Sequence, residues 1–314
     1  MAVTFDKLTK PSNVADYTVD TGHRKLGLGI GVVGLFIAMA VAIIGLVAAN
    51  DVGNGVEVGD LLAVAFGLNT VALATLKIAI AVVLIGILVR LWLRVESVKT
   101  SVAELKPNTT AEPTKSSSAD TAYGPATVSA RAPATLPIHR MARTMWAPML
   151  AMGAMAVAAG WVVSLVWASN VGTETGTTAS AWTQGLQFLG EGMILAGISF
   201  LLASILGGLR DGGGQVQEAL GVPVKTLAMP NTAKAFIVLM AAGLMVSIAQ
   251  FVLYLVTTSF DTAAEVATWF AWLGPLRELG LGLLLAGIVL ALATIANVLG
   301  FQFGRIRDIV KTGQ

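Results

Sequence analysis

Six long apolar stretches dominate the chain, and polar residues are concentrated in the segments that separate them. The stretches run near residues 26–49, 69–93, 145–168, 185–209, 235–257 and 273–300. A bilayer core about 30 Å thick requires roughly 20 apolar residues in helical conformation, and every stretch reaches that length. None shows the strict alternation over about ten residues that is typical of a membrane β-strand. The pattern therefore predicts an all-α integral membrane protein with six transmembrane helices.

The composition agrees with a membrane protein and excludes several classes of function. Of the 314 residues, 55% are hydrophobic and only 12% are charged, whereas about a quarter of a soluble domain is charged. A formal net charge of +2 provides no large basic surface, so we expect no nucleic-acid partner. The absence of cysteine excludes disulfides and thiolate metal sites. No catalytic constellation stands out, and we predict neither enzymatic activity nor a cofactor or metal.

The charged residues predict the orientation of the helices. Every Lys and Arg except Lys77 and Arg277 lies in or beside the termini and the connections that follow the second and fourth stretches. The other connections carry only acidic residues, namely Asp51, Glu57, Asp60, Glu174, Asp261 and Glu265. The positive-inside rule then places both termini in the cytoplasm. Because the first stretch is about twice as long as a signal-peptide core, we expect it to remain uncleaved, in a prokaryotic plasma (inner) membrane.

Internal similarity predicts three copies of a two-helix hairpin. When residues 139–220 are aligned with 229–310 without a gap, many identical residues coincide, including Gly190 with Gly280 and Trp182 with Trp272. Residues 38–42 repeat 154–158, and the word Val-Lys-Thr recurs at 98–100, 224–226 and 310–312. Each copy crosses the membrane twice, so the copies are parallel. We expect three hairpin repeats around a pseudo-threefold axis.

These repeats predict how the chain is divided. The interval 107–138 is rich in Pro, Ser, Thr and Ala and has few large apolar residues, so we expect a flexible cytoplasmic linker that does not fold alone. The predicted units are a cytoplasmic segment 1–25, a first hairpin 26–106, the linker 107–138, a second hairpin 139–228 and a third hairpin with its tail 229–314.

Four ionisable residues lie inside or at the edge of the predicted spans: Lys77, Glu191, Arg277 and Glu278. Each costs about 2.5–3.5 kcal/mol at the centre of a membrane unless it is paired or hydrated. In the repeat register Lys77, Glu191 and Glu278 share one face of the even-numbered helices, so we expect Lys77 to pair with Glu191, with Arg277 and Glu278 nearer the outer end. Such a cluster either fixes which helices meet or serves as a proton or ion site.

Small residues spaced four apart predict close packing of helices. Gly192 with Ala196, and the aligned Gly282 with Ala286, form such pairs. These faces dock the repeats on one another or dock a neighbouring protein. We therefore predict a non-catalytic subunit or scaffold of a larger membrane assembly, with membrane-protein partners or further copies of itself. The alternative is a small ion- or proton-linked transporter or channel that uses Lys77, Glu191 and Glu278.

Three local signals receive structural interpretations. The glycines of residues 29–34 match a dinucleotide-binding fingerprint, but no strand precedes them, so they indicate helix packing. His23 and His139 precede odd-numbered stretches and are each followed by Arg, which is typical of an interfacial basic cap. Pro275 favours the start of a helix, so we expect residues 269–273 to lie along the outer surface.

Overall fold

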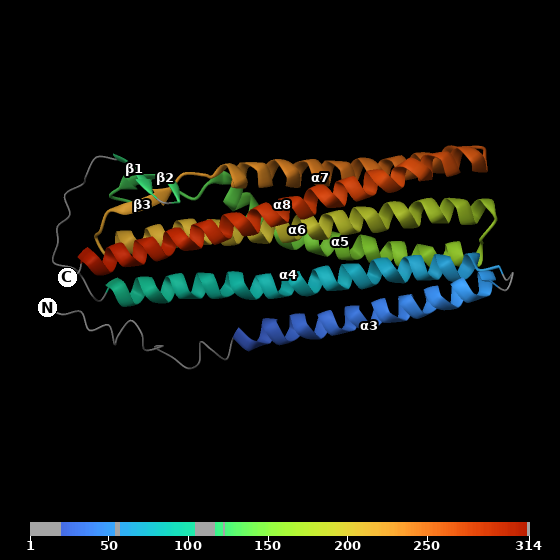
Figure 1. Cartoon of the computed structure of the whole chain (residues 1–314), viewed down its shortest axis with the longest axis horizontal. Coiled ribbons are helices and arrows are strands. Elements are labelled where there is room, and N and C mark those ends of the chain that lie inside the picture. The colour runs from blue at the N-terminus through green and yellow to red at the C-terminus, as the bar shows by residue number, and fades with distance from the viewer. Residues whose placement is uncertain (1–19, 54–56, 104–116, 122, 313–314) are drawn as a thin grey trace.

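Six long helices make up most of the molecule, and each is long and apolar enough to cross a membrane. The computed structural model describes residues 20–53, 57–103, 117–121 and 123–312. Figure 1 shows the helices side by side: α3 (Asp20–Gly53), α4 (Gly59–Ala103), α5 (Pro137–Ser169), α6 (Glu174–Ala219), α7 (Asn231–Val256) and α8 (Ala263–Thr312). The six apolar helices expected from the sequence are confirmed. Most of the predicted segment 1–25 lies outside the described residues.

Local sequence explains where several helices begin. Pro137 occupies the first turn of α5, where its missing amide hydrogen has no helical partner to lose. Thr173 caps α6, because its hydroxyl accepts a hydrogen bond from the Gly176 amide at 3.1 Å, and Glu174 adds negative charge to the first turn. With 46 residues, α6 extends over roughly 70 Å, well beyond the thickness of a bilayer core.

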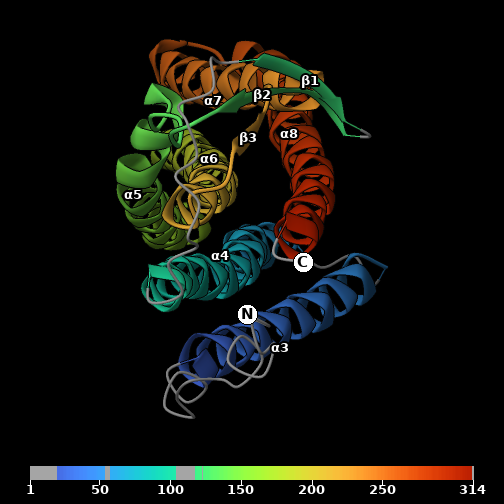
Figure 2. The ribbon, with the colours of Figure 1, turned by 90° about the vertical axis from the view of Figure 1, so that its left-hand side faces the viewer.

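Helix α6 lies at the centre of the bundle. In its most apolar window 89% of residues are buried, against 6% for α3. Figure 2 shows α4, α5, α7 and α8 around α6, and all four contact it, whereas α3 contacts only α4 among the described elements. Small residues along α6, including Gly190, Gly192 and Gly197, allow these neighbours to approach closely.

The expected pseudo-threefold axis is not what the contacts show. Such an axis would bring α4, α6 and α8 together in three equivalent pairs. Helix α6 contacts both α4 and α8, but within the described part of the chain α4 and α8 are not packed against each other. The physical reason is that α6 is the helix richest in small buried residues, so it accepts neighbours on every side and separates α4 from α8.

Glycines bring the paired helices together at positions 90 residues apart. A Cβ atom at Gly153 of α5 would lie 2.8 Å from the carbonyl oxygen of Gly190 in α6. In the next hairpin, a Cβ atom at Gly243 of α7 would lie 2.9 Å from the carbonyl oxygen of Gly280 in α8. Neither first-helix position tolerates a side chain without a shift of one helix, so both crossings depend on glycine.

The expected flexible linker is wrong for its described second half. Strands β1 (Ser117–Thr121) and β2 (Gly124–Ser129) pair with β3 (Val224–Leu227) in a three-stranded antiparallel sheet of order β1-β2-β3. Ala126 lies opposite Leu227, and both are buried against Leu206 of α6 and Val298 and Phe301 of α8. The strands fold because β3 supplies hydrogen bonds and the helices supply the apolar surface that the segment lacks. We call this end of the bundle the sheet end.

The three copies of the Val-Lys-Thr sequence lie in different kinds of element. Residues 224–226 form part of a strand, whereas residues 98–100 lie in α4 and residues 310–312 in α8. The three copies therefore do not mark the same structural position.

The interpretation of Pro275 as a helix start is also wrong. Helix α8 begins at Ala263 and contains Pro275 in its interior. Trp269 and Trp272 belong to this helix, and their ring centroids lie 5.3 Å apart. Beside the proline, the buried side-chain amide of Gln250 donates to the carbonyl oxygen of Leu273 at 2.9 Å.

Candidate intramembrane charge site

Three ionised side chains from three helices meet about halfway along the bundle. Lys77 belongs to α4, Glu191 to α6 and Arg277 to α8. The Lys77 Nζ atom lies 3.1 Å from Oε2 of Glu191, and Nη2 of Arg277 lies 3.8 Å from the same oxygen. One carboxylate therefore faces two cations, and the structure brings together the three helices whose charges were expected to share a face.

Glu191 is the most enclosed member of this triad. Its side chain is only 1% exposed, while Lys77 and Arg277 are partly buried. The second carboxylate oxygen, Oε1, is buried and has no hydrogen-bond partner. A buried carboxylate is costly unless it is paired, and the two cations supply that pairing.

Aromatic packing holds Arg277 in place. Its guanidinium carbon lies 3.9 Å from the centroid of the Phe188 ring, one turn before Glu191 on α6. Phe188 in turn packs against Tyr254 of α7 with ring centroids 5.6 Å apart. The cation–π contact is favourable where water is excluded, so it compensates in part for the longer ion pair of Arg277.

Glu278 stands at the edge of the site. Its side chain is 73% exposed, and its described ionic contact is with the Nε atom of Arg277 at 3.8 Å. Adjacent residues of a helix point about 100° apart, so Arg277 and Glu278 cannot both face α6. The structure thus brings three of the four predicted residues together and leaves the fourth on the rim.

A polar stripe on α6 leads to Glu191 and was missed by sequence reasoning. Thr183 and Gln187 precede Glu191 at intervals of four residues, and all three are buried. Thr70 of α4 donates to Oε1 of Gln187 at 3.0 Å, while the hydroxyl of Thr183 has no partner. Residues four apart share a helix face, so a polar residue every four positions in an otherwise apolar stretch was a signal available from the sequence.

The two aligned small-residue pairs have opposite surroundings. Gly192 and Ala196 are buried, and Gly192 faces Ser247 of α7 at a distance that leaves no room for a side chain. Gly282 and Ala286 of α8 are exposed, and a Cβ atom at Gly282 would meet nothing within 4 Å. The first pair is an internal helix contact, and the second forms an open notch on the outside of the bundle.

The histidines lie away from the charge triad. Nδ1 of His139, which is buried, lies 3.0 Å from the carbonyl oxygen of Ala203, so Nδ1 carries the proton in this bond. His23 of α3 packs beside Gly86 of α4. Within the described ranges, no three His, Asp or Glu residues are arranged to hold a metal ion.

No protein family, curated protein or solved structure matches this chain. A carboxylate with one unpaired oxygen, held between two cations, can either lock three helices in register or exchange a proton.

Proposed function

We propose that the protein is a non-catalytic subunit or scaffold of a membrane assembly. The observation that carries this proposal is the open notch at Gly282 and Ala286 on the outside of α8. Close approach of two backbones across small residues is how membrane helices associate where lipid removes any hydrophobic drive. The notch is therefore suited to a helix of a partner protein or of a second copy.

The internal counterpart of the notch supports this reading. We infer that the second and third hairpins are duplicates, because the glycine crossings Gly153–Gly190 and Gly243–Gly280 recur 90 residues apart. At the equivalent place on α6, Gly192 receives α7. The face of α6 around Gly192 is therefore covered by α7, whereas the aligned face of α8 around Gly282 is open.

In this proposal the charge triad has a structural role. Lys77, Glu191 and Arg277 tie α4 and α8 to the central helix, since each cation meets the same carboxylate oxygen. A slip of one helix by a single turn, about 5.4 Å, would leave a charge unpaired inside the membrane. The proposed orientation has the sheet end in the cytoplasm, in the inner membrane of a prokaryote, as the distribution of Lys and Arg favours.

The test compares two substitutions at Gly282. Gly282→Leu fills the exposed notch and should abolish the larger species seen when native membranes are solubilised mildly and separated by size. Gly282→Ala adds only a methyl group, which leaves the notch open, and serves as the control. Both variants should unfold at the wild-type temperature, because nothing in the chain occupies the notch. A wild-type protein that always migrates as a single chain, or a Gly282→Leu variant that keeps the assembly, contradicts the proposal.

A second candidate function is proton- or ion-linked transport. It is favoured by the unpartnered Oε1 of Glu191, together with the buried stripe through Thr183 and Gln187 that approaches it. Each step along this stripe is about 6 Å, which one or two ordered waters span.

This candidate is tested by flux in proteoliposomes. Glu191→Gln should abolish proton-linked uptake, measured with a pH-sensitive dye inside the vesicles. Glu278→Gln is the comparison, because its exposed position places it outside the stripe and the flux should persist. Flux that survives in Glu191→Gln rejects transport through this residue.

A further inference from the structure

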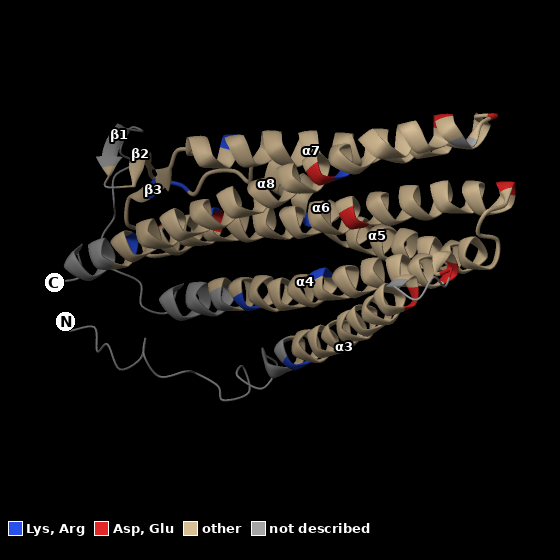
Figure 3. Ribbon diagram, turned by 45° about the vertical axis from the view of Figure 1, so that its right-hand side comes forward, with Lys and Arg blue, Asp and Glu red and all other residues tan. Residues whose placement is uncertain are grey.

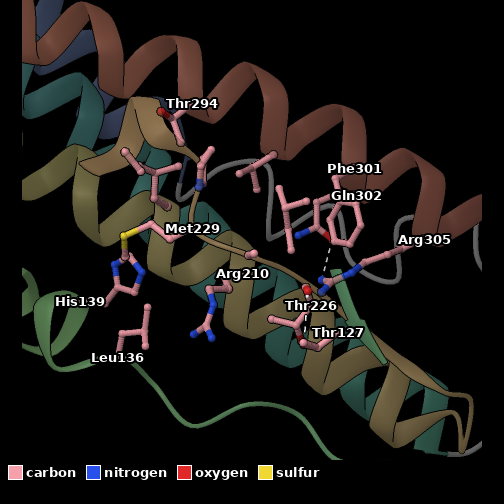
Figure 4. Close-up of a pocket in the computed structure, with 16 residues that line it drawn as sticks. Thr127, Leu136, His139, Arg210, Thr226, Met229, Thr294, Phe301, Gln302 and Arg305 are labelled. Atoms are coloured by element: carbon pink, nitrogen blue, oxygen red, sulfur yellow. Dashed lines mark hydrogen bonds between the residues drawn. The ribbon is translucent and has the colours of Figure 1, made fainter. Parts of the chain in front are cut away.

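A cavity of about 310 Å³ lies at the sheet end, away from the charge triad. Figure 4 shows side chains from helices and strands converging on it, with Phe301, Gln302 and Arg305 contributed by α8. Its volume is at the lower end of the range of small-molecule sites. We call it the sheet-end cavity.

The charges that line the cavity are not balanced. Arg210 and Arg305 line it, and no acidic residue is among the lining residues that the structure describes. Asp211 is 3.2 Å from Arg210 and 3.8 Å from Arg143, so one carboxylate is already shared by two arginines. Among the side chains that the structure describes, none offers Arg305 a carboxylate within 4.0 Å.

Arg305 is nevertheless buried. Only 3% of it is exposed. One terminal nitrogen donates to Oε1 of Gln302 at 3.2 Å and the other to the carbonyl oxygen of Lys225, while its Nε has no acceptor. The guanidinium carbon lies 4.7 Å from the centroid of the Phe301 ring. A buried charge is costly unless a counter-charge meets it, so this arrangement calls for an anion.

A second polar group of the cavity also lacks a partner. The hydroxyl of Thr226 in β3 is buried, with 5% of the residue exposed, and makes no hydrogen bond. A hydroxyl and a guanidinium are both donors to a phosphate or carboxylate oxygen. Two independent unsatisfied donors, Thr226 and Arg305, therefore line one cavity.

The rest of the lining is mainly apolar. Leu136, Leu206, Leu227, Met229, Val298 and Phe301 surround the polar groups. A small inorganic anion would leave these side chains against empty or hydrated space, whereas an amphiphile would cover them. The apolar walls thus favour a ligand with a hydrocarbon portion attached to its charge.

We propose that the sheet-end cavity binds an anionic lipid, whose phosphate or carboxylate oxygens accept from Arg305, Arg210 and Thr226 while its apolar portion packs on Leu206, Val298 and Phe301. This proposal is independent of the subunit role and of transport. It concerns residues on α6, α8 and β3 that the charge triad does not touch.

The experiment uses the full-length protein purified in a neutral detergent. Phosphatidylglycerol, phosphatidylcholine and inorganic phosphate are titrated separately, and binding is followed by the rise in unfolding temperature and by native mass spectrometry. Phosphatidylglycerol should stabilise the protein and remain bound. Equal stabilisation by the zwitterionic phosphatidylcholine, or by inorganic phosphate alone, overturns the proposal.

Two variants locate the site. Arg305→Gln should lower the affinity for phosphatidylglycerol at least about tenfold, because it removes the charge-assisted donors. Arg131→Gln, an exposed arginine at the same end, should bind as the wild type does. Thr226→Val retains shape and removes a hydroxyl that has no partner in the chain, so it should fold normally and still bind the lipid more weakly. Undiminished binding by either Arg305→Gln or Thr226→Val overturns the assignment.

Discussion

Glu191 is, with Asp211, one of the two buried acidic residues in the described part of the chain. It is almost fully buried in the middle of a helix and meets Lys77 and Arg277 through one oxygen. Removal of the carboxylate is therefore more harmful than removal of Lys77. Loss of Lys77 leaves the carboxylate with Arg277, whereas loss of the carboxylate leaves two cations facing each other.

This inequality predicts the order of stabilities. Glu191→Gln should reduce the free energy of unfolding by about 3–5 kcal/mol, as expected when one partner of a buried pair is removed. Lys77→Met should cost less, and Glu278→Gln should have little effect because that side chain is exposed. Thermal unfolding in detergent, followed by tryptophan fluorescence, ranks the three variants. A Lys77→Met variant less stable than Glu191→Gln would refute the assignment of Glu191 as the shared partner.

At the scale of elements, the two glycine crossings differ in tolerance. A Cβ atom at Gly190 would lie 2.7 Å from the backbone oxygen of Gly153, which cannot yield without moving α5. A Cβ atom at Gly280 would lie 2.9 Å from a methyl group of Val246, which can rotate, and 3.7 Å from the nearest backbone oxygen.

We therefore expect Gly190→Ala to be the more harmful substitution. It should destabilise the protein by about 1–3 kcal/mol, as overpacking typically does, and Gly280→Ala by less. Denaturant or thermal unfolding of the two variants in the same detergent measures the difference. Equal losses would mean that the α5–α6 crossing is more adaptable than its backbone contact indicates.

The elements also show what the sequence can and cannot predict. The six apolar helices follow from length and hydropathy alone. Helix periodicity placed Lys77 and Glu191 together, but it put Glu278 on their shared face, whereas the structure has Arg277 at the carboxylate and Glu278 exposed. The sheet was not predictable, because residues 117–129 acquire their order from β3, about 100 residues later. The centrality of α6 was missed because the hairpin repeats suggested equal roles for α4, α6 and α8, whereas the burial of small residues makes them unequal.

At the scale of the whole molecule, charge separates the two ends. Basic residues gather toward the sheet end, and the tight connections at the opposite end carry acidic residues (Figure 3). The start of α3 and the end of α8 lie toward the sheet end (Figure 1). The molecule can therefore cross the bilayer in one of two orientations, with the sheet end either in the cytoplasm or on the outer side.

The absence of native cysteine makes this choice measurable. Ser259→Cys places a unique thiol at the acidic end, and Ala130→Cys places one near the sheet; both positions are exposed. A membrane-impermeant maleimide should label Ser259→Cys in intact cells or spheroplasts and Ala130→Cys only after permeabilisation. The reverse pattern would invert the proposed topology.

The shared carboxylate has a further consequence for biogenesis. Translation delivers α4 first, α6 later and α8 last, so a nascent chain holds Lys77 in lipid before its acidic partner has been synthesised. During that interval the lysine bears the full cost of insertion, about 2.5–3.5 kcal/mol at mid-membrane. Insertion of α6 supplies Glu191 as the partner of Lys77, and insertion of α8 then adds Arg277. The ribosome thus supplies the three charges in the order plus, minus, plus, so that α6 and then α8 each meet an oppositely charged residue that has already been synthesised.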